Sequence, residues 1–149
     1  MNITLNLIEK FLLKVDNLFP IPLSNKCELK LLARKFAEKA TICAHLIDNE
    51  IVALVAGYTN DSVGKIGYIS IVATLSEEQG KGYASKLIRQ FLDIAEQKNL
   101  EAVHLYADRR NASALTIYRR LGFVEWKMPD DPRESDLHLI FEFSKENQI

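Results

Sequence analysis

Residues 76–88 read SEEQGKGYASKLI and place two glycines, Gly80 and Gly82, in a polar loop immediately before an amphipathic helix. Glycine permits backbone conformations that residues with side chains resist, and it lets a ligand approach the main chain closely. The N–H groups of such a turn, joined to the free donors at a helix start, form an anion site. A phosphate group is the natural occupant, although a loop of this kind also serves simply to join a strand to a helix.

The loop fits neither of two common phosphate-binding motifs. No Gly-Lys-Ser/Thr follows at the P-loop spacing, and Ser85 stands where the dinucleotide fingerprint G-x-G-x-x-G needs its third glycine. A second stretch, NASALTIYRRLGF at residues 111–123, is more informative in combination with the loop. The residues that carry the pattern are Gln79, Gly82, Ala84, Asn111, Ala114, Tyr118, Gly122 and Phe123.

In this combination the two stretches resemble the GNAT superfamily of acyl-CoA-dependent N-acyltransferases. The resemblance covers residues 66–123 and implies an α/β fold, with a central mixed, mostly antiparallel sheet flanked by helices. It implies one N-acetyltransferase domain over residues 1–149, with acetyl-CoA as co-substrate and no metal.

The resemblance also assigns roles to individual residues. The main chain of the glycine loop is expected to wrap the pyrophosphate of coenzyme A, which points to Gln79, Gly80, Lys81, Gly82, Tyr83 and Ala84. Asn111 takes a place along the pantetheine arm, and Tyr118 takes a place near the thioester sulfur. A free backbone N–H on the preceding strand is expected to meet the acetyl carbonyl, with Val72, Ala73 and Thr74 as candidates.

Tyr118 is our candidate general acid. A tyrosine, with an ordinary pKa of about 10, is protonated at neutral pH and can donate to a leaving thiolate. The alternative is a packed helix residue, because Tyr118 also belongs to an apolar stripe with Ala114, Ile117 and Leu121.

The general base is harder to assign, because the strand KIGYISIVAT carries no carboxylate. A base position of some superfamily members is occupied by Tyr68, and a neutral tyrosine is a poor base at pH 7. A water held by Tyr68 or Ser70, a histidine (His45 or His104), or an acceptor that arrives as a neutral amine are the open alternatives.

Periodicity predicts the element order α-α-β-β-β-α-β-α-β-β. A first helix runs to about residue 17, and Asn25 with Glu28 predicts the capping pair of a second helix. The strand-like runs TICAHLID, IVALVAGY and IGYISIVATL follow, the first two joined by a tight turn at residues 48–50. The strands are expected to be antiparallel neighbours. The usual strand before the first helix is not evident, so either the sheet is shortened or a strand lies in MNITLNL.

Beyond the glycine loop, a helix is expected to end near residues 98–99. The strand EAVHLYA, a helix closed by Gly122 and the strand FVEWKM come next. A last, half-buried strand is predicted from the alternation of Leu137, Leu139, Phe141 and Phe143.

Composition limits the possible partners. The chain has 149 residues, with 19 basic against 20 acidic side chains, so it has no global field that would gather nucleic acid or an anionic membrane. Charged residues interrupt the apolar N-terminus, which argues against a signal peptide or a membrane span. The two cysteines fit no metal-ligand spacing, and Cys43 in an apolar run reads as a buried thiol. A cytoplasmic protein, monomeric or homodimeric, is expected.

These observations lead to a functional hypothesis: transfer of an acetyl group from acetyl-CoA to a primary amine by direct attack. A small-molecule acceptor such as an amino sugar is favoured, and a protein N-acetyltransferase or a non-catalytic acetyl-CoA-binding module are the alternatives. Two loops are expected to shape the acceptor site. NLFPIPLSN, residues 17–25, offers an apolar wall from Phe19, Pro20, Ile21 and Pro22, and PDDPRESD, residues 129–136, offers Asp130, Asp131 and Glu134 to a cationic amine.

Overall fold

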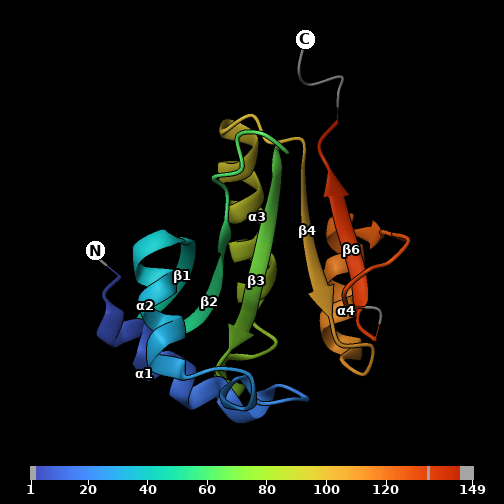
Figure 1. The fold of residues 1–149 in the computed structure, drawn as a ribbon. Helices are drawn as coiled ribbons and strands as arrows, with labels where there is room; N and C mark the ends of the chain where they lie inside the picture. Colours follow the sequence, from blue (N-terminus) through green and yellow to red (C-terminus); the bar gives the residue numbers. More distant parts are fainter. Residues whose placement is uncertain (1–2, 134, 145–149) are drawn as a thin grey trace.

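The computed structural model describes residues 3–133 and 135–144. Its backbone is a mixed α/β arrangement around one six-stranded sheet, in the order β1-β2-β3-β4-β6-β5 (Figure 1). The pair β3–β4 is parallel and every other pair is antiparallel. The α/β class predicted from the sequence is confirmed.

The first half of the chain forms two helices and an antiparallel meander. Its elements are α1 (Leu5–Val15), the 3-10 turns η1 (Asp16–Leu18) and η2 (Leu23–Asn25), α2 (Leu29–Lys39), β1 (Thr41–Ile47), β2 (Glu50–Tyr58) and β3 (Ile66–Thr74). The tight turn predicted over residues 48–50 is present and is formed by two residues, Asp48 and Asn49, both at positive φ, between β1 and β2.

The second half supplies the remaining elements: η3 (Ser76–Glu78), α3 (Tyr83–Gln97), β4 (Ala102–Ala107), α4 (Ala112–Leu121), β5 (Val124–Glu125) and β6 (Leu137–Glu142). Gly122 ends α4 in the left-handed conformation, as predicted. The parallel step from β3 through α3 to β4 carries the chain across the sheet.

Two hydrophobic clusters lie on opposite faces of the sheet. One packs α3 and α4 against the sheet around Phe91, and the other packs α1 and α2 around Phe11 and Phe36. Figure 1 shows that α1 and α2 cover their face of the sheet at β1 and β2 only. On that face, the loop that precedes β6 lies against β4 and β6.

Three expectations about elements are wrong. Asn25 lies in η2, and the N-cap of α2 is Glu28, with no side-chain capping bond. The strand expected over FVEWKM is only two residues long. Its last bond to the sheet runs from Trp126 N–H to His138 O, and beyond it the chain leaves the edge of the sheet. The final strand is not half-buried, since its first four residues are all buried.

The start of the chain holds no strand in its described part. Helix α1 begins at Leu5, where the Thr4 hydroxyl accepts from Leu7 N–H. Residues 1–2 of the run MNITLNL lie outside the described residues.

Candidate active site

Strands β3 and β4 separate part of the way along their length. They pair only from Ile66↔Ala102 to Ile69↔Leu105, yet β3 continues to Thr74 and β4 to Ala107. A β-bulge marks the point of separation, because β2 pairs Ala56 with Ile71 and Gly57 with Ile69. Since a bulge bends its strand, the second half of β3 turns away from β4 and a gap opens in the sheet.

Strand alternation shows which N–H groups face this gap. Leu75 N–H donates to Val52 O at 2.9 Å, so Leu75 points its backbone groups toward β2. In an antiparallel pair these directions alternate, so Ala73 also points toward β2, while Val72 and Thr74 point toward the gap. Thr74 O is already an acceptor there, from Gln79 Nε2 at 3.3 Å. Of the three candidate donors, Val72 is the one best placed to meet a ligand, because it lines both of the cavities described below and Thr74 lines only the first.

The glycine loop closes one end of the gap. Gly80 and Gly82 have φ of +81° and +85°, a left-handed conformation that residues with a Cβ rarely adopt. No atom lies within 4 Å of a Cβ built at either glycine, so the space in front of the loop is open. The first bond of α3 runs from Lys86 N–H to Gly82 O, which leaves the N–H groups of the first turn free for an anion.

The Lys81 side chain is paired within the loop. Its Nζ donates to Glu78 Oε2 at 2.7 Å, and its side chain does not line the neighbouring cavity. This ion pair raises the pKa of Lys81 through the Glu78 hydrogen bond, so the ammonium stays charged. The main-chain N–H groups are therefore the loop's candidate anion donors.

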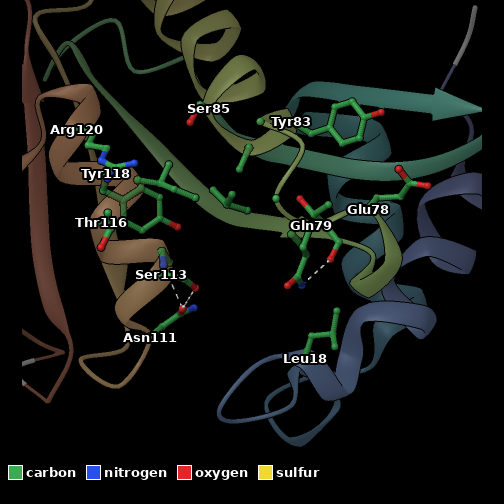
Figure 2. Close-up of a pocket in the computed structure, with 18 of the residues that line it drawn as sticks. Leu18, Glu78, Gln79, Tyr83, Ser85, Asn111, Ser113, Thr116, Tyr118 and Arg120 are labelled. Carbon is green, nitrogen blue, oxygen red and sulfur yellow. Dashed lines mark hydrogen bonds between the residues drawn. The ribbon is translucent and has the colours of Figure 1, made fainter.

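A cavity of about 650 Å³ extends from the glycine loop to α4. Figure 2 shows Gln79 and Tyr83 on one side of it, and Asn111, Ser113, Thr116 and Tyr118 on the other. Its wall includes all but one of the predicted cofactor residues: Val72, Ala73, Thr74, Gln79, Gly80, Gly82, Tyr83, Ala84, Asn111 and Tyr118. Lys81 is the exception.

Two residues of the α4 region have structural roles as well as a place in this cavity. Asn111 caps α4, since its Oδ1 accepts from Ala114 N–H at 3.2 Å. Tyr118 is 7% exposed and packs edge-on against Phe123, and burial raises the pKa of its phenol to about 12. The hydroxyl is therefore protonated throughout the neutral range. Tyr118 is packed, as one sequence interpretation has it, and it also lines the cavity, while its role as general acid stays a prediction.

A second cavity, of about 330 Å³, lies against the first. The two share five lining residues: Phe19, Val72, Asn111, Ala114 and Tyr118. Of the apolar wall expected from residues 17–25, Phe19, Pro20 and Ile21 line the second cavity and Pro22 does not. Tyr68 and Ser70 line it from β3, and Arg133 and Asp136 line it from the loop before β6.

The histidines proposed as bases lie outside both cavities. His45 stacks on Tyr83, with 4.2 Å between ring centroids. His104 lies behind Tyr68, and its Nδ1 is 2.8 Å from His138 Nε2. Burial, reinforced by His138, lowers the pKa of His104 to about 4, so His104 is neutral at pH 7 and holds a proton poorly.

The acidic loop is used differently from the sequence hypothesis. Asp131 is not free to attract an amine, because Oδ2 is 2.7 Å from His138 Nδ1 and Oδ1 accepts from the Tyr106 hydroxyl at 3.0 Å. Asp130 does not line either cavity. Glu134 lies outside the described residues.

Tyr106 is a cavity residue that sequence reasoning missed. It lines the second cavity from β4, two residues after His104 and on the same face of the sheet. The period-2 alternation in EAVHLYA carries this signal, since it places the two polar rings of the strand together.

Two further findings concern the described residues only. Within residues 3–133 and 135–144, no group of three or more His, Cys, Asp or Glu side chains is placed to hold a metal ion. In the same part of the chain, no helix has the length and apolarity needed to cross a bilayer.

A bulged strand that parts from a parallel neighbour, a glycine loop at a helix start and a cavity spanning the gap define the class: an acyltransferase fold of the GNAT type. Comparison with known proteins agrees, since residues 11–123 match the profile of the Acetyltransferase (GNAT) family. The chain belongs to this family.

Individual relatives differ in their acceptors. The chain is 39% identical over 61 residues to a mycothiol acetyltransferase of Arthrobacter sp. (strain FB24), covering 41% of this chain and 19% of that protein. It is 34% identical over 61 residues to N-alpha-acetyltransferase 30 of Schizosaccharomyces pombe, covering 41% of each. The chain thus spans well under half the length of these relatives.

Among solved structures, the PaiA N-acetyltransferase of Thermoplasma acidophilum, in complex with coenzyme A, superposes with a TM-score of 0.69. The two are 11% identical over 93% of this chain and 92% of that one. At 11% identity, this structural similarity is evidence for the fold alone.

Proposed function

We propose that the protein transfers the acetyl group of acetyl-CoA to the primary amine of a small molecule. The observation that carries the proposal is the meeting of two cavities at Val72 and Tyr118. One cavity has an anion-binding loop and the other has a mixed polar lining, so a thioester from one side and an amine from the other can meet at the gap. The coenzyme A complex of the structural neighbour supports the choice of cofactor.

In this proposal, the first-turn N–H groups of α3 and the loop from Gln79 to Ala84 hold the pyrophosphate of the cofactor. Asn111 lies along the pantetheine arm. Val72 N–H donates to the thioester carbonyl oxygen, and this bond strengthens as that oxygen gains negative charge in the transition state.

Transfer then requires two proton movements. A neutral amine attacks the carbonyl carbon, the C–N bond forms, and the C–S bond breaks as the Tyr118 hydroxyl gives its proton to the departing sulfur. The proton of the new ammonium leaves through a water held by Tyr68 and Ser70, which line the acceptor cavity. The Tyr118 phenolate regains a proton from solvent before the next turnover. No acyl-enzyme is needed, because neither Cys27 nor Cys43 lines either cavity.

An amino sugar is the first candidate acceptor, and an amino-acid or polyamine-like amine is the second. A cavity of about 330 Å³ is at the small end of ligand pockets. Its charged residues are of both signs: Lys26, Asp108, Arg133 and Asp136. The relative named for mycothiol, a small molecule, supports this choice.

Acetylation of a protein N-terminus is the second candidate function. It is favoured by the relative named N-alpha-acetyltransferase 30, which the chain matches over 41% of its length. A peptide would have to reach the gap with its N-terminal residue in the second cavity.

Thiol release from acetyl-CoA, measured across a panel of amines, tests the proposal. The panel contains glucosamine, a nucleotide-linked amino sugar, putrescine, free amino acids and peptides with free N-termini. We expect the highest kcat/KM with an amino sugar. Efficient turnover of peptides alone would overturn the small-molecule proposal in favour of N-terminal acetylation.

We further propose that residues 1–149 act as one domain, in the cytoplasm, as a monomer or homodimer. The single sheet, with a hydrophobic cluster on each face, supports one folding unit. Size-exclusion chromatography with light scattering tests the oligomeric state.

A further inference from the structure

Behind the second cavity lies a chain of hydrogen bonds that the proposed transfer does not use. The hydroxyl of Tyr106 donates to Asp131 Oδ1 at 3.0 Å, Asp131 Oδ2 lies 2.7 Å from His138 Nδ1, and His138 Nε2 lies 2.8 Å from His104 Nδ1. His138 is 5% exposed, so this network is set into the protein rather than spread over its surface. Unpaired polar atoms are costly in such a setting, and among the described residues no buried side-chain atom of this network lacks a partner.

The charge of Asp131 sets the direction of the bonds that it makes. The pKa of Asp131 is lowered, first by the backbone N–H of Arg133, so Asp131 is a carboxylate and only accepts. His138 Nδ1–H therefore donates to it. At the other end, the Tyr106 proton points at Asp131.

The bond to Asp131 determines which hydrogen bonds the Tyr106 hydroxyl can form with a ligand in the cavity. A phenol has one proton and an oxygen that also accepts. Because the proton is committed to Asp131, Oη retains only its accepting role toward a ligand. A carboxylate one hydrogen bond behind also makes Oη a stronger acceptor, since linked hydrogen bonds polarise one another.

The ring of Tyr106 is held as firmly as its hydroxyl. It stacks on His138, with 4.1 Å between centroids and 18° between planes, and the Arg133 guanidinium lies 4.7 Å from its centroid. Arg133 is itself paired with Asp136 at 2.6 Å. A side chain fixed in this way loses little freedom when it binds a ligand.

We propose that Tyr106 recognises the acceptor amine by accepting a hydrogen bond from its N–H. Asp131 is the positioning residue: it accepts the phenol proton and so leaves Oη to accept from the amine. The inference rests on the proposed function and names a specificity residue of the same site. The preferred ligand group is a hydrogen-bond donor such as the N–H of a primary amine, and a group that only accepts, such as an ether oxygen, does not satisfy Oη. Asp131 thus acts on the amine through Tyr106 rather than by direct contact.

A double-mutant cycle tests the coupling. Tyr106→Phe removes the acceptor oxygen and keeps the ring. Asp131→Asn removes the negative charge behind the phenol: its amide oxygen can keep the bonds from Tyr106 and Arg133 N–H at the Oδ1 position, while its NH2 group faces His138 Nδ1 in place of Oδ2. Asp130→Asn, a change of the same charge one residue away, is the matched control, and circular dichroism verifies folding of each variant.

For the panel amine with the highest turnover, Tyr106→Phe is expected to raise the acceptor KM about 2- to 10-fold, as for the loss of a hydrogen bond between neutral groups. Asp131→Asn is expected to raise it by a smaller factor, because the phenol keeps an amide oxygen as a weaker acceptor behind it. The KM for acetyl-CoA stays unchanged. The double variant is no worse than Tyr106→Phe alone, because Asp131 acts only through the phenol. Asp130→Asn behaves like the unmodified protein.

Two results would overturn the inference. One is an unchanged acceptor KM in Tyr106→Phe. The other is an equal loss from Asp131→Asn with and without the Tyr106 hydroxyl, which would make Asp131 a support for its loop.

A ligand-free measurement separates this inference from the proposed function. The Asp131 hydrogen bond contributes to the raised pKa of Tyr106, after burial of the ring. NMR titration of 13C-labelled tyrosine should therefore show a lower Tyr106 pKa in Asp131→Asn, and an unchanged pKa would refute the coupling. If the unmodified protein acetylates no amine of the panel, the proposed function fails and this inference falls with it. Normal turnover without coupling in the cycle overturns this inference alone.

Discussion

Replacing Gly82 by glutamate perturbs the glycine loop where the cofactor pyrophosphate is proposed to lie. Two effects combine. A Cβ at φ +85° strains the backbone by about 1–2 kcal/mol. The carboxylate then projects into open space in front of the loop, where it opposes the charge of the phosphates.

The charge effect can be separated from the steric one. Two like charges on the order of 5 Å apart repel by about 3 kcal/mol at an effective dielectric constant of 20. The loop is exposed, and solvent with salt reduces this to about 1.5–2 kcal/mol. Gly82→Gln has the same shape without the charge, so acetyl-CoA should bind to Gly82→Glu about 10- to 30-fold more weakly than to Gly82→Gln.

Isothermal titration calorimetry with acetyl-CoA measures both variants, and circular dichroism confirms that both fold. The ratio of their dissociation constants should shrink as salt is raised, because the difference is electrostatic. Equal affinity of the two folded variants at low salt would refute the placement of the pyrophosphate at this loop.

Three other predictions follow from buried or paired groups. Tyr118→Phe keeps the ring that packs on Phe123, so the fold should survive while kcat falls about 10²-fold or more; an unchanged kcat at saturating substrate would place the acid elsewhere. Cys43 is buried and its pKa is raised to about 11, whereas Cys27 is exposed, so iodoacetamide at about pH 8 should alkylate Cys27 alone in the folded protein; mass spectrometry showing Cys43 modified first would contradict this core. The pKa of His104, about 4 in the folded state against an ordinary value of about 6.5, means that the unfolded chain binds the proton more tightly. His104 should therefore make the protein lose stability as pH falls from about 6.5 toward 4, and melting temperatures that His104→Gln leaves equally pH-dependent would refute this.

Much of the fold was predictable because each element carries its own local pattern. The amphipathic period of α3, the Asp48-Asn49 turn and the αL cap at Gly122 depend on neighbours in the chain, so sequence alone identifies them. The glycine loop and the Asn111 to Phe123 stretch were recognised in the same way. Ten of the eleven predicted cofactor residues line one cavity.

What the sequence could not show depends on neighbours in space. The selection of Val72 over Ala73 as the free donor rests on the register of β3 against β2, fixed by the bond from Leu75 N–H to Val52 O, and a register is a property of two strands. Asp131 was taken for a free acid because its partners, Tyr106 and His138, lie 25 and 7 residues away. Asn25 looked like a helix cap by spacing, but η2 intervenes before α2 begins.

A crystal structure of the protein with acetyl-CoA bound tests the central claim most directly. We predict that the thioester carbonyl oxygen accepts from Val72 N–H at about 2.9 Å. The sulfur should lie beside the Tyr118 hydroxyl, and the acetyl group should face the second cavity. An acetyl group whose carbonyl oxygen bonds elsewhere, or which is walled off from the cavity lined by Tyr68 and Tyr106, would contradict the account.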